Sequence, residues 1–414
     1  MVEATIQTYQ EIQKRFRPTP AKSHYTYNLR DVSKVFQGIS KSDPRANTDE
    51  ASAVKLWAHE CMRVFQDRLI SQEDRDQLLE LLKEKTAQKF RKSLEDLIEV
   101  KPLLFGSFTP MIFPDGDESK KALPDIYCEL TNRDLVSKRC TSMLEEFNTM
   151  NRSKAMNLVL FTDAIEHIVK IHRIITTQYG NALLVGVGGS GRKSLSELST
   201  FIASYEMVQL EIIKGYGMKD WREDMINSLF AAAGIDSVPH VFLMPDTSII
   251  NESFVEDINN ILNNGKIPNL YATEDIQKII EDMKDQHKSD DLIKGMEDGE
   301  IMQVFEDCAK NSIHVILAFS PIGDDFVRRL RMFPALVNCC TIDWFLPWPA
   351  EALKSVAYQF LGKIEDLPMI DGIVAICVDM QERVHKMSLK YLFEVRKYYY
   401  VTPTSYLILI KMFE

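Results

Sequence analysis

Hydrophobic positions follow two different spacings along this chain. In roughly the first 100 residues they recur at helical intervals, which predicts helices over 1–15, 25–39, 51–70 and 75–98. From residue 181 onward, short wholly apolar runs alternate with amphipathic stretches. Such runs are typical of parallel strands buried on both faces, and we expect strands at 182–185, 207–213, 240–244, 313–319 and 339–342.

Helical patterns also border this α/β region on both sides. A helix over 133–149, an apolar run over 156–161 and a helix over 163–176 lead into it, and helices over 349–361, 371–396 and 406–413 follow it. A stretch rich in proline and glycine, 101–123, is an irregular connector. The pattern therefore predicts four parts: a helical piece 1–100, a connector and helix 101–150, an α/β domain 151–347 and a second helical piece 348–414.

The most specific motif is the glycine-rich stretch 181–194, Asn-Ala-Leu-Leu-Val-Gly-Val-Gly-Gly-Ser-Gly-Arg-Lys-Ser. It has the layout of a P-loop, in which a strand, a glycine turn and a helix N-terminus hold phosphate through backbone N–H groups. A turn without a ligand is the alternative, and the flanking strand and helix disfavour it. The expected nucleotide-binding residues here are Gly186, Gly188, Gly189, Ser190, Gly191, Arg192, Lys193 and Ser194, and positive φ is expected at Gly188, Gly189 and Gly191.

Two positions depart from the P-loop pattern. Arg192 stands where a lysine is expected, and it can still neutralise phosphate through its planar guanidinium. Lys193 stands where a serine or threonine is expected, so the usual hydroxyl ligand of Mg²⁺ is missing, and Ser194 comes one residue late. The motif predicts a site that holds a nucleotide but is altered where hydrolysis needs it.

Polar residues at two strand ends extend this prediction. Asp246 ends the run 241–245 and is the candidate Mg²⁺ ligand, although it could instead cap the helix expected over 252–262. Thr247 follows it, where a catalytic glutamate would be expected, so no catalytic residue is assigned. Ser320 ends the run 313–319 and is a candidate sensor of the γ-phosphate or a simple turn residue.

A cluster of arginines follows, at positions 328, 329 and 331, just before a proline. It is either a solvated helix end or a set of fingers that reach a neighbouring module's phosphates. A faint repeat also links Arg17-Pro-Thr-Pro-Ala-Lys-Ser-His-Tyr with Val401-Thr-Pro-Thr-Ser-Tyr. Five residues beyond each tyrosine stands a cation, Arg30 or Lys411, which suggests an equivalent element in two successive modules.

Composition narrows the class of protein. A net charge of −11 argues against nucleic acid as the main partner, and twelve acidic residues against four lysines between 274 and 307 indicate a solvated helical insertion. The seven cysteines show no metal-ligand spacing, as in a protein of a reducing compartment, the cytoplasm. No apolar run reaches the ~20 residues that span a bilayer, so no membrane is expected as a partner.

Taken in order, these motifs resemble the dynein heavy chain family, most closely its axonemal class. The resemblance rests on motifs from the end of a third AAA+ module and most of a fourth, among them Pro18-Thr-Pro-Ala-Lys-Ser-His-Tyr, Leu56-Trp-Ala-His-Glu-Cys-Met-Arg-Val-Phe, Gly186-Val-Gly-Gly-Ser-Gly-Arg, Lys214-Gly-Tyr-Gly and Asn251-Glu-Ser-Phe-Val-Glu-Asp-Ile-Asn-Asn. It implies an AAA+ P-loop NTPase large domain, a parallel sheet flanked by helices, between two helical small subdomains. It also implies a place in an ATP-driven microtubule motor of the cilium or flagellum axoneme, part of the cytoskeleton.

The resemblance further implies roles for single residues and for partners. Arg30 matches the sensor-2 arginine of the third module, and Arg328 or Arg331 the finger offered back to that module. The fourth module is expected to be regulatory, with ATP or ADP bound, Mg²⁺ optional and hydrolysis weak or absent. Expected partners are the neighbouring modules, dynein intermediate and light chains for the parent protein, and microtubules only through a stalk that lies beyond this sequence.

Two other interpretations stay open. The module could be an active ATPase with Glu252 or another carboxylate as base. It could instead be a structural scaffold of the ring whose pocket holds no nucleotide.

Overall fold

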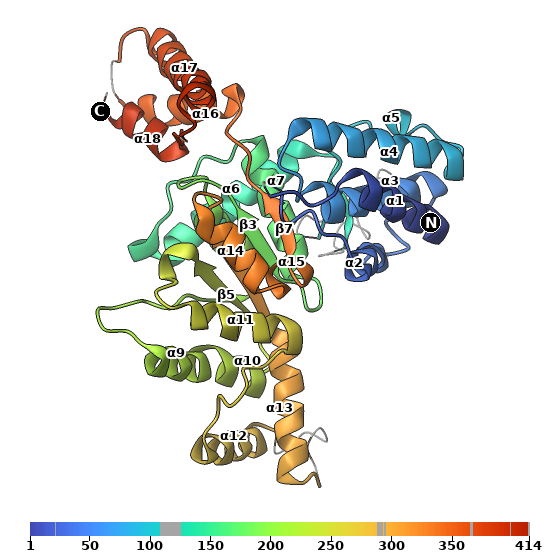
Figure 1. Ribbon diagram of the computed structural model, residues 1–414, viewed down its shortest axis with the longest axis vertical. Helices are drawn as coiled ribbons and strands as arrows, with labels where there is room; N and C mark the ends of the chain where they lie inside the picture. The colour runs from blue at the N-terminus through green and yellow to red at the C-terminus, as the bar shows by residue number, and fades with distance from the viewer. Residues whose placement is uncertain are drawn as a thin grey trace.

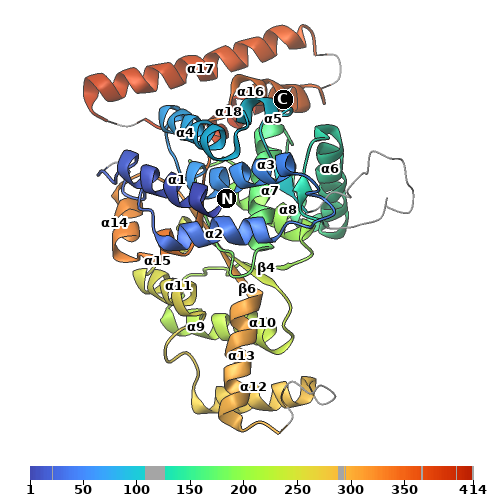
Figure 2. The same ribbon diagram turned by 90° about the vertical axis from the view of Figure 1, so that its right-hand side faces the viewer.

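The computed structural model describes residues 1–20, 22–107, 126–287, 293, 295–364, 367–397 and 399–412. Figure 1 shows a central sheet with a helical group from the start of the chain on one side and a helical group from its end above it. In both views the helices α12 (Thr273–Gln286) and α13 (Asp298–Ser312) lie at the opposite end of the molecule from that last group (Figures 1 and 2). Part of the predicted connector, 108–125, lies outside the described residues.

The N-terminal helical part has its own core. Its helices are α1 (Val2–Arg15), α2 (Leu29–Ser40), α3 (Glu50–Cys61), which continues as a π-helical turn η1 (Met62–Gln66), α4 (Gln72–Phe90) and α5 (Leu94–Leu97). Trp57 and Phe65 are fully buried at its centre, and the Trp57 indole donates to Thr5 Oγ1 at 2.9 Å. The helix predicted from residue 25 begins at Leu29, because Asn28 caps it by accepting from the Arg30 and Asp31 N–H groups. A short antiparallel pair, β1 (Phe105–Gly106) and β2 (Cys128–Glu129), follows.

The central sheet has five parallel strands in the order β4-β5-β6-β3-β7. Their bounds are β3 (Ala182–Val185), β4 (Glu206–Val208), β5 (His240–Pro245), β6 (Ile313–Phe319) and β7 (Thr341–Trp344). Each overlaps a predicted apolar run, but the bounds of the two edge strands, β4 and β7, were wrong. The first edge strand, β4, stops at Val208 because it pairs with β5 only over three residues. The other edge strand, β7, starts two residues late because the Cys339 N–H still belongs to α15 (Ala335–Asn338), donating to the Ala335 carbonyl.

Alternate residues of β3 pack into different cores, as a strand buried on both faces requires. Ala182 and Leu184 join the core beneath α6 (Arg133–Met150), α7 (Thr162–Ile175) and α8 (Arg192–Ile202). Leu183 and Val185 join the larger core on the opposite face. The helical elements on that face are α9 (Met218–Asp224), η4 (Met225–Phe230), α10 (Ala231–Ile235), α11 (Glu252–Asn264), α13 and α14 (Asp324–Met332), with α15. Short 3-10 turns are η3 (Arg152–Lys154) and η5 (Asp246–Ser248).

The C-terminal helices α16 (Ala350–Leu361), α17 (Ile370–Val395) and α18 (Pro403–Lys411) enclose a small core around Leu353, Cys377 and Tyr406. α18 begins three residues before the predicted 406 because Thr402 caps it and Pro403 occupies its first position. The proposed repeat is wrong in its register. Arg30 is the second residue of α2, whereas Lys411 is the last residue of α18, so the two cations are not equivalent.

Within the described residues, no helix combines the length and the apolar character that crossing a bilayer requires.

Candidate nucleotide site

The glycine loop joins β3 to α8, and its conformation needs glycine at three positions. Gly189 and Gly191 have φ of +80° and +90°, which side chains with a Cβ rarely adopt. At Gly186, an added Cβ would lie 2.8 Å from the Cβ of Phe345. Gly188 differs from the prediction: its φ is not positive and no atom lies within 4 Å of the place of a Cβ. The loop therefore depends on Gly186, Gly189 and Gly191 for its shape, and not on Gly188.

Two side chains of the loop have buried polar atoms without a partner. Ser190 Oγ and Arg192 Nη1 make no hydrogen bond within the described part of the chain. Burial lowers the pKa of Arg192, because it disfavours the charged guanidinium, and the charge of Asp246 opposes that effect. A half-buried cation and a buried hydroxyl, each with a polar atom that lacks a partner, form a place for an anion at a helix N-terminus.

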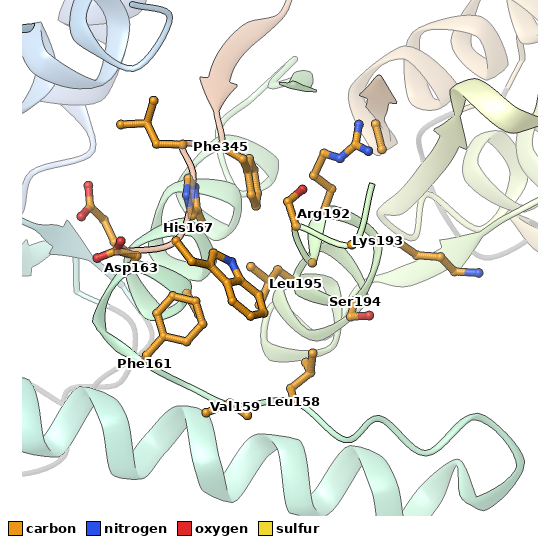
Figure 3. A pocket seen from close by; sticks show the side chains of 18 of the residues that line it. Leu158, Val159, Phe161, Asp163, His167, Arg192, Lys193, Ser194, Leu195 and Phe345 are labelled. Carbon is orange, nitrogen blue, oxygen red and sulfur yellow. The ribbon is translucent and has the colours of Figure 1, made fainter. Parts of the chain in front are cut away.

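Lys193 does not share this environment. Its side chain is mostly exposed, with Nζ 3.9 Å from Glu197 Oε1, and in Figure 3 it extends away from the aromatic side chains of the pocket. Ser194 also lines the pocket. Because residue 193 is a lysine, the hydroxyl group that a P-loop offers to Mg²⁺ at this position is absent.

The ends of β5 and β6 meet beside the loop. Oδ2 of Asp246 accepts a hydrogen bond from the Ser320 N–H at 2.8 Å, and Ser320 Oγ accepts one from the Ile322 N–H at 3.3 Å. Asp246 and Thr247 line the pocket, and Ser320 is not among its lining residues. Asp246 does not cap the following helix, since Asn251 does so through the Ser253 N–H.

Glu252, the alternative base, forms ion pairs with two arginines. Its Oε1 lies 3.0 Å from the Nη2 atoms of both Arg328 and Arg329. It is not among the residues that line the pocket. Because its carboxylate is engaged by two guanidinium groups and lies outside the pocket lining, Glu252 is not placed to act as a general base.

The pocket itself has a volume of about 590 Å³ and lies between the α/β domain and the C-terminal helices. The glycine loop forms one wall, and Figure 3 shows Leu158, Val159 and Phe161 on the other side of the cavity. Trp348 adds to its apolar lining, and the C-terminal helices contribute Val356, Phe360 and Leu407. This combination of an apolar chamber and an anion-binding loop suits a nucleotide, with its base in the chamber and its phosphates at the loop.

Comparison with known proteins agrees with this architecture. Residues 156–414 match the family model for the P-loop containing dynein motor region D4, and residues 1–75 match the dynein heavy chain ATPase lid domain. The chain belongs to the dynein heavy chain family. Among its relatives, human dynein axonemal heavy chain 1 is 43% identical over 100% of this chain and 9% of its own length. Human axonemal heavy chains 3 and 6 are 40% and 39% identical, again over 100% of this chain and 10% of their own length.

This chain therefore spans about a tenth of the length of those relatives. The AAA+ fold expected from its motifs is confirmed: a parallel sheet flanked by helices, in the dynein motor region. Residues 1–75 of the N-terminal helical part match a dynein heavy chain ATPase lid domain, and their assignment to a preceding module stays a prediction.

One end of the dynein pocket carries charged or ionisable side chains that the sequence analysis did not identify. We call this part, lined by Glu166, His167 and Lys170, the charged end. Nδ1 of His167 lies 2.6 Å from Oδ2 of Asp343, and its ring stacks on Phe345 at 3.8 Å between centroids. Burial alone would raise the pKa of Asp343, but the charges of His167 and Lys170 outweigh it and hold that pKa well below its usual range. Lys170 Nζ lies 2.8 Å from Glu166 Oε1.

This charged end continues into the preceding lid. Lys170 Nζ lies 3.3 Å from Asp67 Oδ1, and the Trp344 N–H donates to the Asp67 carbonyl at 3.0 Å. Arg63 Nε lies 2.9 Å from Asp67 Oδ2. A buried ion network therefore joins the lid of the preceding module to the wall of the nucleotide pocket.

The sequence carried little signal for the apolar wall of the pocket or for its charged residues. The apolar run 156–161 was recognised, but nothing in it indicated a ligand, and its role becomes visible only where it faces the loop across the cavity. Trp348 and His167 are isolated in sequence, and packing brings them to the pocket, with Asp343 behind His167.

The residues predicted to serve the preceding module lie away from this pocket. Arg30 Nη1 lies 3.1 Å from Cys339 Sγ, in a second cavity of about 640 Å³ also lined by Lys34 and Lys310. Arg328 is exposed and paired with Glu252 and Asp325. Arg331 is exposed on the last turn of α14.

Proposed function

We propose that this chain is a regulatory segment of an axonemal dynein heavy chain and that its pocket binds ADP or ATP with weak or no hydrolysis. The observation that carries the proposal is the half-buried guanidinium of Arg192 at the phosphate loop, whose Nη1 makes no hydrogen bond and whose side chain forms no ion pair within the described residues. The apolar chamber opposite the loop accommodates a base.

Weak hydrolysis follows from the groups around the strand ends. Position 247 carries a hydroxyl instead of a carboxylate, and Glu252 is paired with two arginines. A water attacking the γ-phosphate therefore lacks a base to orient it and take its proton. The bound nucleotide would instead act on conformation, by favouring one placement of helices α16–α18 over another.

The residues present do not fit the Mg²⁺ site that a P-loop NTPase usually has. Asp246 has one oxygen engaged by the Ser320 N–H, and Lys193 replaces the hydroxyl ligand. No group of three or more acidic, histidine or cysteine side chains in the described ranges is arranged to hold a metal ion. Protein cations are therefore proposed to neutralise most of the phosphate charge.

The wider role rests on the relatives, which are named as axonemal heavy chains. We propose that the parent protein acts in the cytoskeleton of a cilium or flagellum as an ATP-driven microtubule motor. Its neighbouring AAA+ modules would be the direct partners of this segment, with Arg30 and either Arg328 or Arg331 serving the preceding module's nucleotide.

The test is to purify the chain, denature it, identify released nucleotide by chromatography and assay ATP turnover on the same sample. Bound ADP or ATP with negligible turnover is expected, and Arg192→Ala should lose the nucleotide. Turnover that Glu252→Gln abolishes would support the active ATPase instead. A folded protein that neither retains nor binds nucleotide would support the scaffold interpretation and contradict the proposal.

A further inference from the structure

In each helical part a helix begins after a capping side chain: α2 after Asn28 and α18 after Thr402, and in both the cap side chain accepts from the backbone of the first turn. The second residue of α2 is Arg30, and the second residue of α18 is Thr404. The second position of α2 therefore carries a cation, whereas the second position of α18 carries a hydroxyl.

Thr404 lies directly on the phosphate loop. Its side-chain oxygen and its backbone occupy the place where a Cβ on Gly189 would stand, with the backbone nitrogen 2.8 Å from that place. Leu407, one turn further along α18, lines the nucleotide pocket. The N-terminus of α18 thus touches the loop from the side of the C-terminal helices.

No cation reaches the pocket from those helices within the described residues. Their contribution to its lining is Val356, Phe360 and Leu407, all apolar. The cations that do line the pocket, Arg75, Lys170, Arg192 and Lys193, come from the preceding lid and from the α/β domain. A γ-phosphate therefore meets no positive side chain on the part that closes over it.

The other candidate sensor, Ser320, is not among the residues that line the pocket. Ser320 donates its N–H to Asp246 and accepts the Ile322 N–H at its hydroxyl. ATP and ADP differ by the γ-phosphate and its charge, and a site prefers one of them only through a group that interacts differently with the two.

We infer that Thr404 is the contact through which helix α18 closes on the phosphate loop, and that this closure does not distinguish ATP from ADP. The inference rests on the proposed nucleotide binding and adds that the site has no preference between ATP and ADP. In effect, the site responds to the presence of a nucleotide and not to its phosphorylation state.

The test is isothermal titration of the chain with ADP and with ATP. The two dissociation constants are expected to agree within about threefold for the unmodified chain. Thr404→Arg places a guanidinium where α2 has Arg30, and is expected to tighten ATP relative to ADP by about tenfold, the effect of one charge-assisted hydrogen bond. Ser405→Arg, which adds the same charge one residue along α18 from the residue that contacts Gly189, is the matched control and should leave the ratio unchanged.

Thr404→Lys is the second variant should the arginine prevent folding, with circular dichroism as the check on both. A preference for ATP of tenfold or more in the unmodified chain would overturn the inference and leave nucleotide binding intact. An equal ratio of the ADP and ATP dissociation constants in the unmodified chain and in folded Thr404→Arg would also overturn the inference. Folded chain that binds neither nucleotide would contradict the proposed function itself, and the inference with it.

Discussion

The backbone N–H of Ser320 donates to Oδ2 of Asp246 at 2.8 Å, so the ends of β6 and β5 are tied together beside the phosphate loop. Both residues were expected at the site from sequence, each at the end of an apolar run. The hydrogen bond gives the carboxylate of Asp246 a structural role in addition to its proposed one.

Replacing this carboxylate should therefore destabilise the chain even without nucleotide. Asp246→Ala leaves the Ser320 N–H without its acceptor, at an expected cost of about 1–3 kcal/mol. Asp246→Asn retains an oxygen acceptor and should cost less than half as much. Urea unfolding of both variants measures the difference, and equal stability of the two would contradict this role.

Replacing Arg192 and replacing the adjacent Lys193 should have very different effects on nucleotide affinity. Arg192 is half-buried at the loop, and its removal in Arg192→Ala should weaken nucleotide binding by about tenfold or more, since charge-assisted hydrogen bonds contribute about 1.5–3 kcal/mol. Lys193 is exposed and its nearest carboxylate is 3.9 Å away, so Lys193→Ala should change affinity less than threefold. Titration with ADP checks both, and a larger loss for Lys193→Ala would show that this side chain turns toward the phosphates.

The loop glycines offer a second matched pair. A Cβ at residue 186 would lie 2.8 Å from that of Phe345, so Gly186→Ala should destabilise the chain by about 1–3 kcal/mol through overpacking. Gly188 has open space around it and no positive φ, and Gly188→Ala should be tolerated within about 0.5 kcal/mol. Thermal melting of the two variants decides, and a melting temperature lowered equally in both would contradict the loop geometry.

The charged end of the pocket should make stability depend on acid. Burial raises the pKa of Glu166, but the charges of Lys170 and Arg63 outweigh it and lower that pKa from 4.5 to about 2. A carboxylate with a depressed folded-state pKa contributes stability that is fully present above pH 4.5 and is lost as the pH falls toward 2. Glu166→Gln removes this contribution, so its unfolding free energy should fall less steeply than that of the unmodified chain between those pH values.

The check is urea unfolding at several pH values, with Glu197→Gln as a control. Glu197 belongs to α8 and its pKa is raised by burial, so its removal should not flatten the acid dependence. Parallel curves for Glu166→Gln and the unmodified chain would show that the network does not hold Glu166 ionised.

Much of the fold was predictable because its determinants are local. β3, β5 and β6 are continuous apolar runs, and their burial on both faces follows from that pattern. The edge strands were less well predicted. β4 ends at Val208 although its neighbour β5 continues to Pro245, and β7 begins only after Cys339, whose N–H donates to the Ala335 carbonyl in α15.

By itself, the sequence determined the glycine loop and the family. Positive φ at Gly189 and Gly191 is a property of single residues and their neighbours, and motifs in order along the chain identify a dynein heavy chain. The tertiary structure decided what surrounds that loop. Thr404 on Gly189 and His167 against Asp343 are contacts between residues about 180 to 220 positions apart, which arise only when packed helices and strands bring distant segments together.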